Sequence, residues 1–165
     1  MKKLAITIQY DGSNYHGWQV QNNAVTVQQT FQDAVEKVFL KRLDVKGCSR
    51  TDSFVHANMY VLTLETDMNI SNEGVIMALN SKLPNDIAVI DCKECENDFH
   101  PRYSCKSKEY IYKIYNGKRP NAFLPKYAFY YRRNIDADYL NREAQAFVGT
   151  FDYSAFCSAK SDVED

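Results

Sequence analysis

The sequence lacks any long run of apolar residues. Its first apolar stretch, residues 4–8, is too short to cross a bilayer or to form the core of a signal peptide, and the turn residues Asp11 and Gly12 follow shortly after it. Hydrophobic residues make up 45% and charged residues 25% of the 165 positions. These proportions are ordinary for a soluble globular protein and fit one domain, or one and a half units of an extended α/β architecture. We therefore expect no membrane segment.

Paired cysteine motifs are also missing. The five cysteines are odd in number, and only Cys92 and Cys95 form a C-x-x-C motif, with no second pair to complete a zinc site. On a strand, residues three positions apart point to opposite faces, which disfavours joint binding of a metal. We expect no metal site, and free cysteines are typical of a reducing cytoplasm.

Several catalytic motifs are absent. The sequence contains no P-loop, no G-x-G-x-x-G and no G-x-S-x-G, so nucleotide binding through these motifs and serine hydrolase chemistry are excluded. The histidines His16, His56 and His100 are too scattered to indicate a metal site. Asp52 has no acidic neighbour closer than Asp44, so a carboxylate dyad is not indicated either.

Positive charge is unevenly distributed, although the net charge is only −1. Residues 99–133, here called the basic segment, contain nine Lys or Arg residues, one acidic residue and ten aromatic residues. Residues 65–98 and 134–165 are acidic by contrast. Cations that meet phosphates and rings that stack on unpaired bases are typical of RNA-binding proteins. A solvated basic sheet with packed tyrosines is the alternative that charge alone leaves open.

Periodicity predicts the order of elements. Alternating apolar residues predict strands at 3–10, 45–49, 58–65 and 86–95. Thr26 caps a predicted helix to residue 41, and Ser71 caps a second one that ends before Pro84. This β-α-β-β-α-β order predicts an α+β fold of the ferredoxin-like type for residues 1–98, with helices on one face of an antiparallel sheet.

A second, similar half is predicted to begin at residue 99 and to share a continuous antiparallel sheet with the first. Its predicted elements are strands at 108–115 and 127–131 and a helix from the Asp136 cap to Gly149. A new element begins at residues 150–156, so this half is unfinished where the sequence ends.

The stretch Ser49-Arg50-Thr51-Asp52 lies on a connection between predicted strands. Ser, Thr and Asp are ordinary turn residues, so a simple turn is one interpretation. The other is a site, because a guanidinium two positions away can keep a carboxylate ionised and oriented, as a nucleophile or base requires. With RNA as partner, a base must leave its stack to reach this carboxylate.

Ordered motifs along the chain resemble the TruA family of tRNA pseudouridine synthases. The matching blocks are Y-D-G-S-N-Y with G-W-Q (residues 10–19), V-Q (27–28), R-T-D with V-H-A (50–57), F-H-P-R-Y-S (99–104), K-S-K with Tyr110 and Tyr112, and G-T-F-D-Y-S-A-F (149–156). Each block alone is weak, but their order over nearly the whole chain is specific. The resemblance strongly favours a site over a simple turn.

This resemblance implies an isomerase without a cofactor, which detaches uracil from C1′ of its ribose, rotates it and rejoins it through C5. The target uridines would lie in the tRNA anticodon stem-loop, at about positions 38 to 40. Asp52 would be the catalytic aspartate, acting by addition to C6, by attack at C1′ or by proton abstraction through a glycal. Arg50 would pair with it and enter the stem, and Tyr110 would contact the flipped base.

The resemblance has further implications for binding and assembly. Arg102, Lys106, Lys108 and Gln19 lie in or beside matching blocks and are predicted to bind the RNA substrate. The family works as a cytoplasmic homodimer that grips tRNA, and its fold has two ferredoxin-like halves with the active-site cleft between them.

Three departures from the family pattern bear on activity. Ser49 and Phe54 stand where the family has glycine, and glycine permits special dihedral angles and close approach. Family members also continue for about half as many residues again. We therefore predict that the 165 residues alone turn over poorly or not at all. A catalytically incomplete tRNA-binding protein is the second hypothesis, and an unrelated ferredoxin-like domain that binds a small ligand or a protein is the third.

Overall fold

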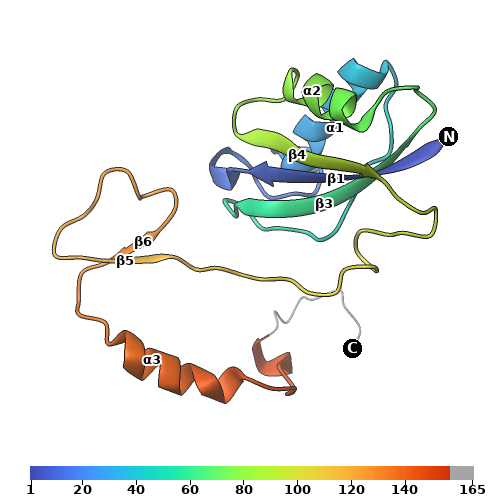
Figure 1. The fold of residues 1–165 in the computed structure, drawn as a ribbon. Helices are drawn as coiled ribbons and strands as arrows, with labels where there is room; N and C mark the ends of the chain where they lie inside the picture. The colour runs from blue at the N-terminus through green and yellow to red at the C-terminus, as the bar shows by residue number, and fades with distance from the viewer. Residues whose placement is uncertain (157–165) are drawn as a thin grey trace. The chain divides into compact units, whose positions relative to one another are not determined.

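The computed structural model describes residues 1–156, which belong to two units: Met1–Tyr110, and a second unit that begins at Ile111. Figure 1 shows their elements along the chain. The boundary after Tyr110 follows from the contacts between residues. The boundary expected after residue 98 is based on charge and aromatic content, so the two differ in position. Each unit is described by itself below.

An antiparallel sheet forms the centre of the first unit. Its four strands are β1 (Lys2–Tyr10), β2 (Lys46–Gly47), β3 (Ala57–Thr66) and β4 (Ile87–Glu94), in the order β2-β3-β1-β4. The three longer strands lie close to their predicted bounds, which confirms these predictions. The predicted strand at 45–49 is present as β2 but is shorter. Register shifts interrupt both ladders of β1, one near its C-terminal end opposite β3 and one in its second half opposite β4.

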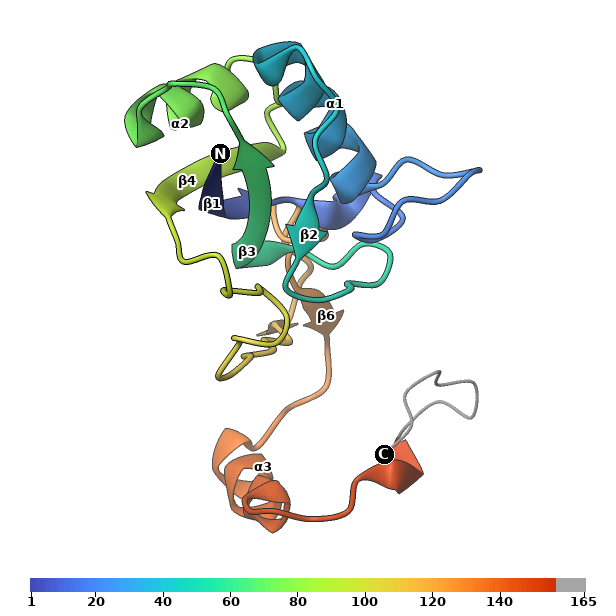
Figure 2. The ribbon, with the colours of Figure 1, turned by 90° about the vertical axis from the view of Figure 1, so that its right-hand side faces the viewer.

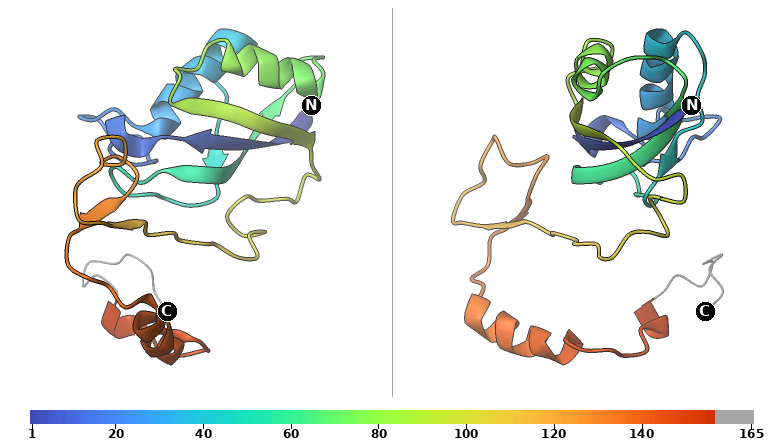
Figure 3. Two further views of the ribbon diagram at one scale, coloured as in Figure 1. Left: turned by 60° about the vertical axis from the view of Figure 1, so that its left-hand side comes forward. Right: turned by 45° about the vertical axis from the view of Figure 1, so that its right-hand side comes forward.

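One face of this sheet is buried beneath two helices, α1 (Val27–Phe39) and α2 (Asn72–Asn80). Figures 2 and 3 show both helices on the same side of the strands. Alternate residues of β1, namely Leu4, Ile6, Ile8 and Tyr10, are buried, as expected for a strand with one covered face. Burial of this apolar surface is the main stabilising contribution to the unit.

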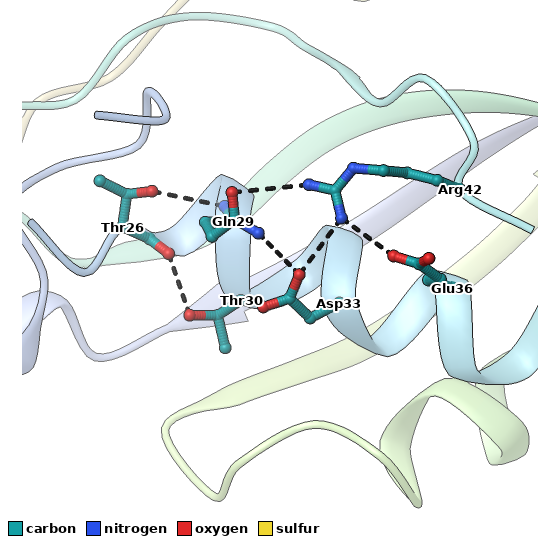
Figure 4. A network of polar contacts seen from close by, with 6 residues as sticks. All are labelled: Thr26, Gln29, Thr30, Asp33, Glu36 and Arg42. Atoms are coloured by element: carbon teal, nitrogen blue, oxygen red, sulfur yellow. Dashed lines mark hydrogen bonds and ion pairs between the residues drawn. The ribbon is translucent and has the colours of Figure 1, made fainter. Parts of the chain in front are cut away.

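Helix α1 begins and ends with residues suited to these positions. The side chain of Thr26 accepts a hydrogen bond from the backbone N–H of Gln29 at 3.4 Å, and Thr26 is fully buried, which confirms the predicted cap. The helix ends at Leu40, whose left-handed conformation (φ 55°) turns the chain back. Arg42 then contacts Asp33 and Glu36 on the helix surface (Figure 4).

Helix α2 contributes to the sheet through its last residue. Ser71 caps the helix as predicted, accepting a hydrogen bond from Gly74 N–H. At the other end, the Asn80 amide donates to the Val89 carbonyl at 2.9 Å and accepts from the Val89 N–H at 2.8 Å. Asn80 therefore satisfies both backbone groups of a residue in β4, which is an edge strand of this sheet.

The second unit has shorter elements than expected. It contains β5 (Ile114–Asn116), β6 (Phe129–Tyr131), α3 (Ala137–Ala144) and the 3-10 turns η2 (Gln145–Phe147) and η3 (Ser154–Phe156). The predicted strand at 108–115 is wrong for most of its length, because residues 108–113 adopt no strand. The Asp136 cap is confirmed, but the predicted helix to residue 149 stops at Ala144.

Strands β5 and β6 pair in parallel as a sheet of their own, so the prediction of antiparallel pairing is wrong for them. A parallel pair requires a connection of about a dozen residues or more, and residues 117–128 provide it. An apolar groove lies between this pair and α3, lined by residues that include Ile114, Phe129, Ile135 and Leu140. Helix α3 has no buried residue. Among the helices of residues 1–156, none is long and apolar enough to cross a membrane.

Candidate active site

Asp52 lies on the loop between β2 and β3, residues 48–56, which we call the aspartate loop. Its side chain is exposed, and so is that of Arg50. Thr51, between them, is half-buried and directs its side chain to Tyr10 of β1, with 2.9 Å between Oγ1 and the Tyr10 Oη. The side chains of Arg50 and Asp52 are thus exposed to solvent, and Thr51 between them attaches the loop to the sheet.

A second loop, residues 11–26 between β1 and α1, which we call the supporting loop, holds the aspartate loop by its backbone. The Trp18 N–H donates to the Thr51 carbonyl at 3.1 Å, and the Phe54 N–H donates to the Tyr15 carbonyl at 3.2 Å. Within the aspartate loop, the Val55 N–H donates to the Asp52 carbonyl at 3.3 Å. These bonds fix the backbone on both sides of Asp52 without using its carboxylate.

Two glycines make this close approach possible. A Cβ on Gly17 would lie 2.3 Å from the Thr51 carbonyl oxygen, and Gly17 also has a φ of +84°. A Cβ on Gly12 would lie 2.0 Å from the Val55 carbonyl oxygen. Any side chain at either position would push the two loops apart. The sequence motifs Y-D-G and G-W-Q are therefore the structural support of R-T-D.

Two tyrosines anchor the aspartate loop to the core. Burial raises the pKa of Tyr10 to about 12, although its hydrogen bond with Thr51 opposes this shift. Tyr60 donates a short hydrogen bond to the Ser49 carbonyl and packs against Trp18, with 4.2 Å between ring centroids. Burial also raises the pKa of Tyr60. Both hydroxyls therefore stay protonated at neutral pH and bind the loop as neutral groups.

A histidine–aspartate contact closes the far end of the aspartate loop. His56 Nδ1 lies 3.1 Å from Asp11 Oδ1 and 3.2 Å from the Gly12 backbone nitrogen, so it either donates to the carboxylate when protonated or accepts from the Gly12 N–H when it is not. Asp11 in turn accepts from the Ser13 N–H at 2.9 Å. Sequence reasoning assigned no role to His56 or Asp11, although both lie within the motif blocks. Their contact joins residues far apart in the sequence, which spacing alone does not reveal.

The predicted site residues are only partly brought together. Within residues 1–156, Arg50 and Asp52 form no ion pair, so the expected pairing is not present in this structure. Gln19 is exposed on the supporting loop directly after Trp18.

The remaining predicted residues lie on the segment after β4. Arg102, Lys106 and Lys108 are exposed there, and Tyr110 is 81% exposed. Arg102 lies over the Tyr103 ring, 5.9 Å from its centroid. No hydrogen bond, ion pair or ring contact in the described part of the chain joins these residues to Asp52. They are accessible to a ligand, and the structure does not place them against the carboxylate.

The same described residues contain no cluster of three or more His, Cys, Asp or Glu side chains placed to hold a metal ion. The cysteines of the C-x-x-C motif differ in environment: Cys92 is buried in the core, and burial raises its pKa to about 11. The exposed charged groups of the aspartate loop are the Asp52 carboxylate and the Arg50 guanidinium. Such a pair suits chemistry on a polar substrate that comes to the surface of the protein.

Residues 6–104, which include both loops, match a family model described as tRNA pseudouridine synthase. The chain therefore belongs to the tRNA pseudouridine synthase family. Among curated relatives, it is 44% identical over 156 residues to tRNA pseudouridine synthase A of Clostridium kluyveri, covering 94% of this chain and 64% of the relative. It is 40% identical over 164 residues to tRNA pseudouridine synthase A of Caldicellulosiruptor bescii, covering 99% of this chain and 67% of the relative.

A relative from Staphylococcus carnosus with the same name is 37% identical over 162 residues, covering 98% of this chain and 61% of the relative. The chain thus spans about two thirds of the length of the curated relatives that it matches. Both loops of the candidate site lie within the matched part.

Proposed function

We propose that the protein containing this chain isomerises uridine to pseudouridine in tRNA, with the Asp52 carboxylate as the reacting group. The observation that carries this proposal is that the loop around Asp52 is held in place while its carboxylate stays exposed. The backbone on either side of it is held from a second loop, Thr51 by Trp18 and Phe54 by Tyr15, and the Asp52 carboxylate is exposed and makes no polar contact within residues 1–156. Because the loop is held in place and the carboxylate has no polar partner within residues 1–156, the carboxylate is available to a substrate. Membership of the tRNA pseudouridine synthase family supports the same reaction.

The reaction rearranges bonds without changing the composition of the nucleotide. The C1′–N1 bond breaks, a C1′–C5 bond forms, the proton on C5 is lost and N1 gains one. No oxidant, reductant or group donor enters this balance, so the reaction needs no cofactor. After cleavage the protein has to hold the detached uracil, so that the base rotates within the site and does not diffuse away.

The target base has to leave its stack before Asp52 can reach it. In our proposal Arg50, exposed two residues away, enters the vacated place in the stem and orients the carboxylate. Tyr110 contacts the flipped base with its exposed ring. Gln19, exposed in the middle of the supporting loop, contacts the same substrate.

The basic segment provides the remaining contacts with RNA. Arg102, Lys106 and Lys108 are exposed, and cations in this position neutralise phosphates independently of sequence. We propose the anticodon stem-loop, at about positions 38 to 40, as the place of modification.

We extend the proposal to the architecture of the whole protein. The sheet order β2-β3-β1-β4, with both helices on one face, supports a ferredoxin-like arrangement for residues 1–98. Residues from 99 onward would begin a second half of the same kind. We further propose a homodimer that works in the cytoplasm, where tRNA is found.

The proposal is tested with protein extended to the full length of the curated relatives. It is incubated with an anticodon-arm RNA, and pseudouridine is measured by mass spectrometry of the nucleosides. The control RNA carries cytidine at positions 38 to 40. Pseudouridine in the first RNA alone supports the proposal. Binding of the RNA without any pseudouridine would instead support a noncatalytic tRNA-binding protein.

A further inference from the structure

Phe54 combines two unfavourable features at one position of the aspartate loop. Its φ is +68°, a left-handed conformation that a bulky aromatic residue rarely adopts. Its side chain is also 63% exposed, so the ring gains little from burial. Glycine or asparagine would suit this backbone better and would cost the fold nothing in packing. An outlier of this kind is a reason to look for a function.

The backbone that carries the ring is held two residues from Asp52. The Phe54 N–H bonds to the Tyr15 carbonyl, and the Val55 N–H bonds to the Asp52 carbonyl, so the backbone on both sides of Phe54 is held. Two residues of chain span at most about 7 Å, which is about the rise of two stacked nucleotides. A base that lies on Phe54 would therefore be within one or two nucleotides of a base that reaches Asp52.

A second ring extends this surface. His16, exposed on the supporting loop, has its centroid 6.2 Å from that of Phe54, with 49° between the planes. The two rings come from different loops, and these loops are clamped together by the Trp18–Thr51 and Phe54–Tyr15 hydrogen bonds. The backbone segments that carry the two rings are therefore held together independently of the rings.

We propose that Phe54, together with His16, forms a stacking platform for an unpaired base next to the target uridine. The inference rests on the proposed function, since it requires RNA to be the ligand. Aromatic side chains stack on bases of any type, and this contact contributes substantially to the affinity for single-stranded segments. The exposed Arg50 guanidinium on the same loop favours a polyanion over an apolar protein partner. Phe54 is thus a binding residue that sets which loop nucleotide lies beside the reacting carboxylate.

The first test replaces Phe54 in the full-length protein. Phe54→Gly removes the ring and also relieves the positive φ, so its melting temperature should equal or exceed that of the parent. Its affinity for anticodon-arm RNA should fall about tenfold, with a matching rise in KM. Met59→Ala is the control, because Met59 is an exposed apolar residue on β3 that carries no such strain. It should leave RNA affinity and turnover unchanged.

The second test observes stacking directly. Phe54→Trp keeps a ring at this position, and Trp18, the one tryptophan among residues 1–165, is buried with only 2% exposure. The fluorescence of the introduced indole should be quenched when RNA binds, and affinity should stay within about twofold of the parent. The parent should bind an RNA with an abasic site next to the target uridine more weakly than the intact RNA. Phe54→Gly should bind the two RNAs equally well, because it has no ring to stack on the missing base.

The outcomes separate this inference from the proposed function. Normal RNA affinity and normal KM in Phe54→Gly would overturn the platform while leaving the synthase proposal intact. Faster turnover in that variant would show that the ring obstructs the site, which also overturns the inference. Absence of quenching in Phe54→Trp would do the same. If the parent itself neither binds nor modifies RNA, both proposals fail together.

Discussion

The backbone N–H of Trp18 donates to the carbonyl of Thr51 at 3.1 Å, and Thr51 is the residue that precedes Asp52. The candidate catalytic carboxylate is therefore positioned by a loop that lies far from it in the sequence. This contact joins backbone atoms and does not involve the Asp52 side chain. Mutations that displace the loop can therefore be distinguished from mutations that remove the carboxylate.

Gly17→Ala should displace the aspartate loop. The added Cβ would lie 2.3 Å from the Thr51 carbonyl oxygen at a φ of +84°, so both a clash and backbone strain result. We expect a loss of about 3 kcal/mol in the free energy of unfolding and a large loss of turnover. Urea unfolding followed by Trp18 fluorescence measures the first effect.

Gly74→Ala is the matched control for this prediction. Gly74 lies within α2 and lacks a positive φ, and its new Cβ would meet side-chain atoms rather than backbone, namely Ile70 Cγ1 at 2.9 Å and Ser71 Oγ at 3.1 Å. Alanine favours the helix, so stability should stay the same or rise by up to about 1 kcal/mol. Equal destabilisation by the two substitutions would contradict the special role of Gly17.

Asp52→Asn should abolish pseudouridine formation and leave RNA binding nearly unchanged. Asparagine keeps the shape of the side chain but removes its charge and nucleophilicity. Because the Asp52 carboxylate has no polar partner within residues 1–156, the melting temperature should also stay the same. If Asp52 only stabilised a turn, its substitution would instead cost about 1 kcal/mol and preserve turnover. Measurement of turnover, affinity and melting temperature on this one variant distinguishes the two roles.

Replacing Lys106 and Lys108 with alanine should weaken binding to all tRNAs alike. Both lysines are exposed in the basic segment, and phosphate contacts carry no sequence information. Filter binding over a range of salt concentrations should show a shallower salt dependence, by about one phosphate contact for each lysine that contacts the RNA. Lys41 and Lys82, which are exposed elsewhere, serve as the control pair. Equal effects of both double substitutions would remove the basic segment from the interface.

Tyr10 should make the fold sensitive to alkaline pH. Its pKa is raised from 10.0 to about 12 in the folded state, mainly by burial. The folded state therefore favours the protonated tyrosine, and this contribution is complete below pH 10 and is lost as the pH rises toward 12. Its size is on the order of 2 kcal/mol.

Tyr10→Phe removes this ionisation and should reduce the loss of stability between pH 9 and pH 12. Tyr15 and Tyr60, whose pKa values are also raised by burial, leave part of the loss in place. Denaturant unfolding at several pH values measures the difference. If the free energy of unfolding of the variant and of the parent fell equally between pH 9 and pH 12, Tyr10 would not be the source of the loss.

Local signals in the sequence predicted the first unit well. The alternation in β1 and the caps Thr26 and Ser71 act over a few residues, so their effects can be read without knowing the fold. The strand predicted at 108–115 had the same kind of pattern, with Tyr110 and Tyr112 on one face. A strand also needs a partner, and most of this segment has no strand pairing in the described residues.

The candidate site was found in part. Ordered motifs pointed to Asp52, and the structure places it on an exposed loop as expected for a site. The need for Gly12 and Gly17 could not be predicted, because it depends on carbonyl oxygens of a distant loop. The contact between His56 and Asp11 is also long-range. In the sequence Phe54 differs from its surroundings only as a departure from the family pattern, and its positive φ gives that departure a physical meaning.

The paired hydrogen bonds between Asn80 and Val89 also constrain how this protein can assemble. Because one amide side chain occupies both backbone groups of Val89, the outer edge of β4 cannot accept another strand there without first releasing α2. Addition of a strand at Val89 is thereby opposed. The homodimer proposed above should therefore leave the Asn80–Val89 hydrogen bonds in place, and exchange of the Val89 amide hydrogen should be equally slow in monomer and dimer.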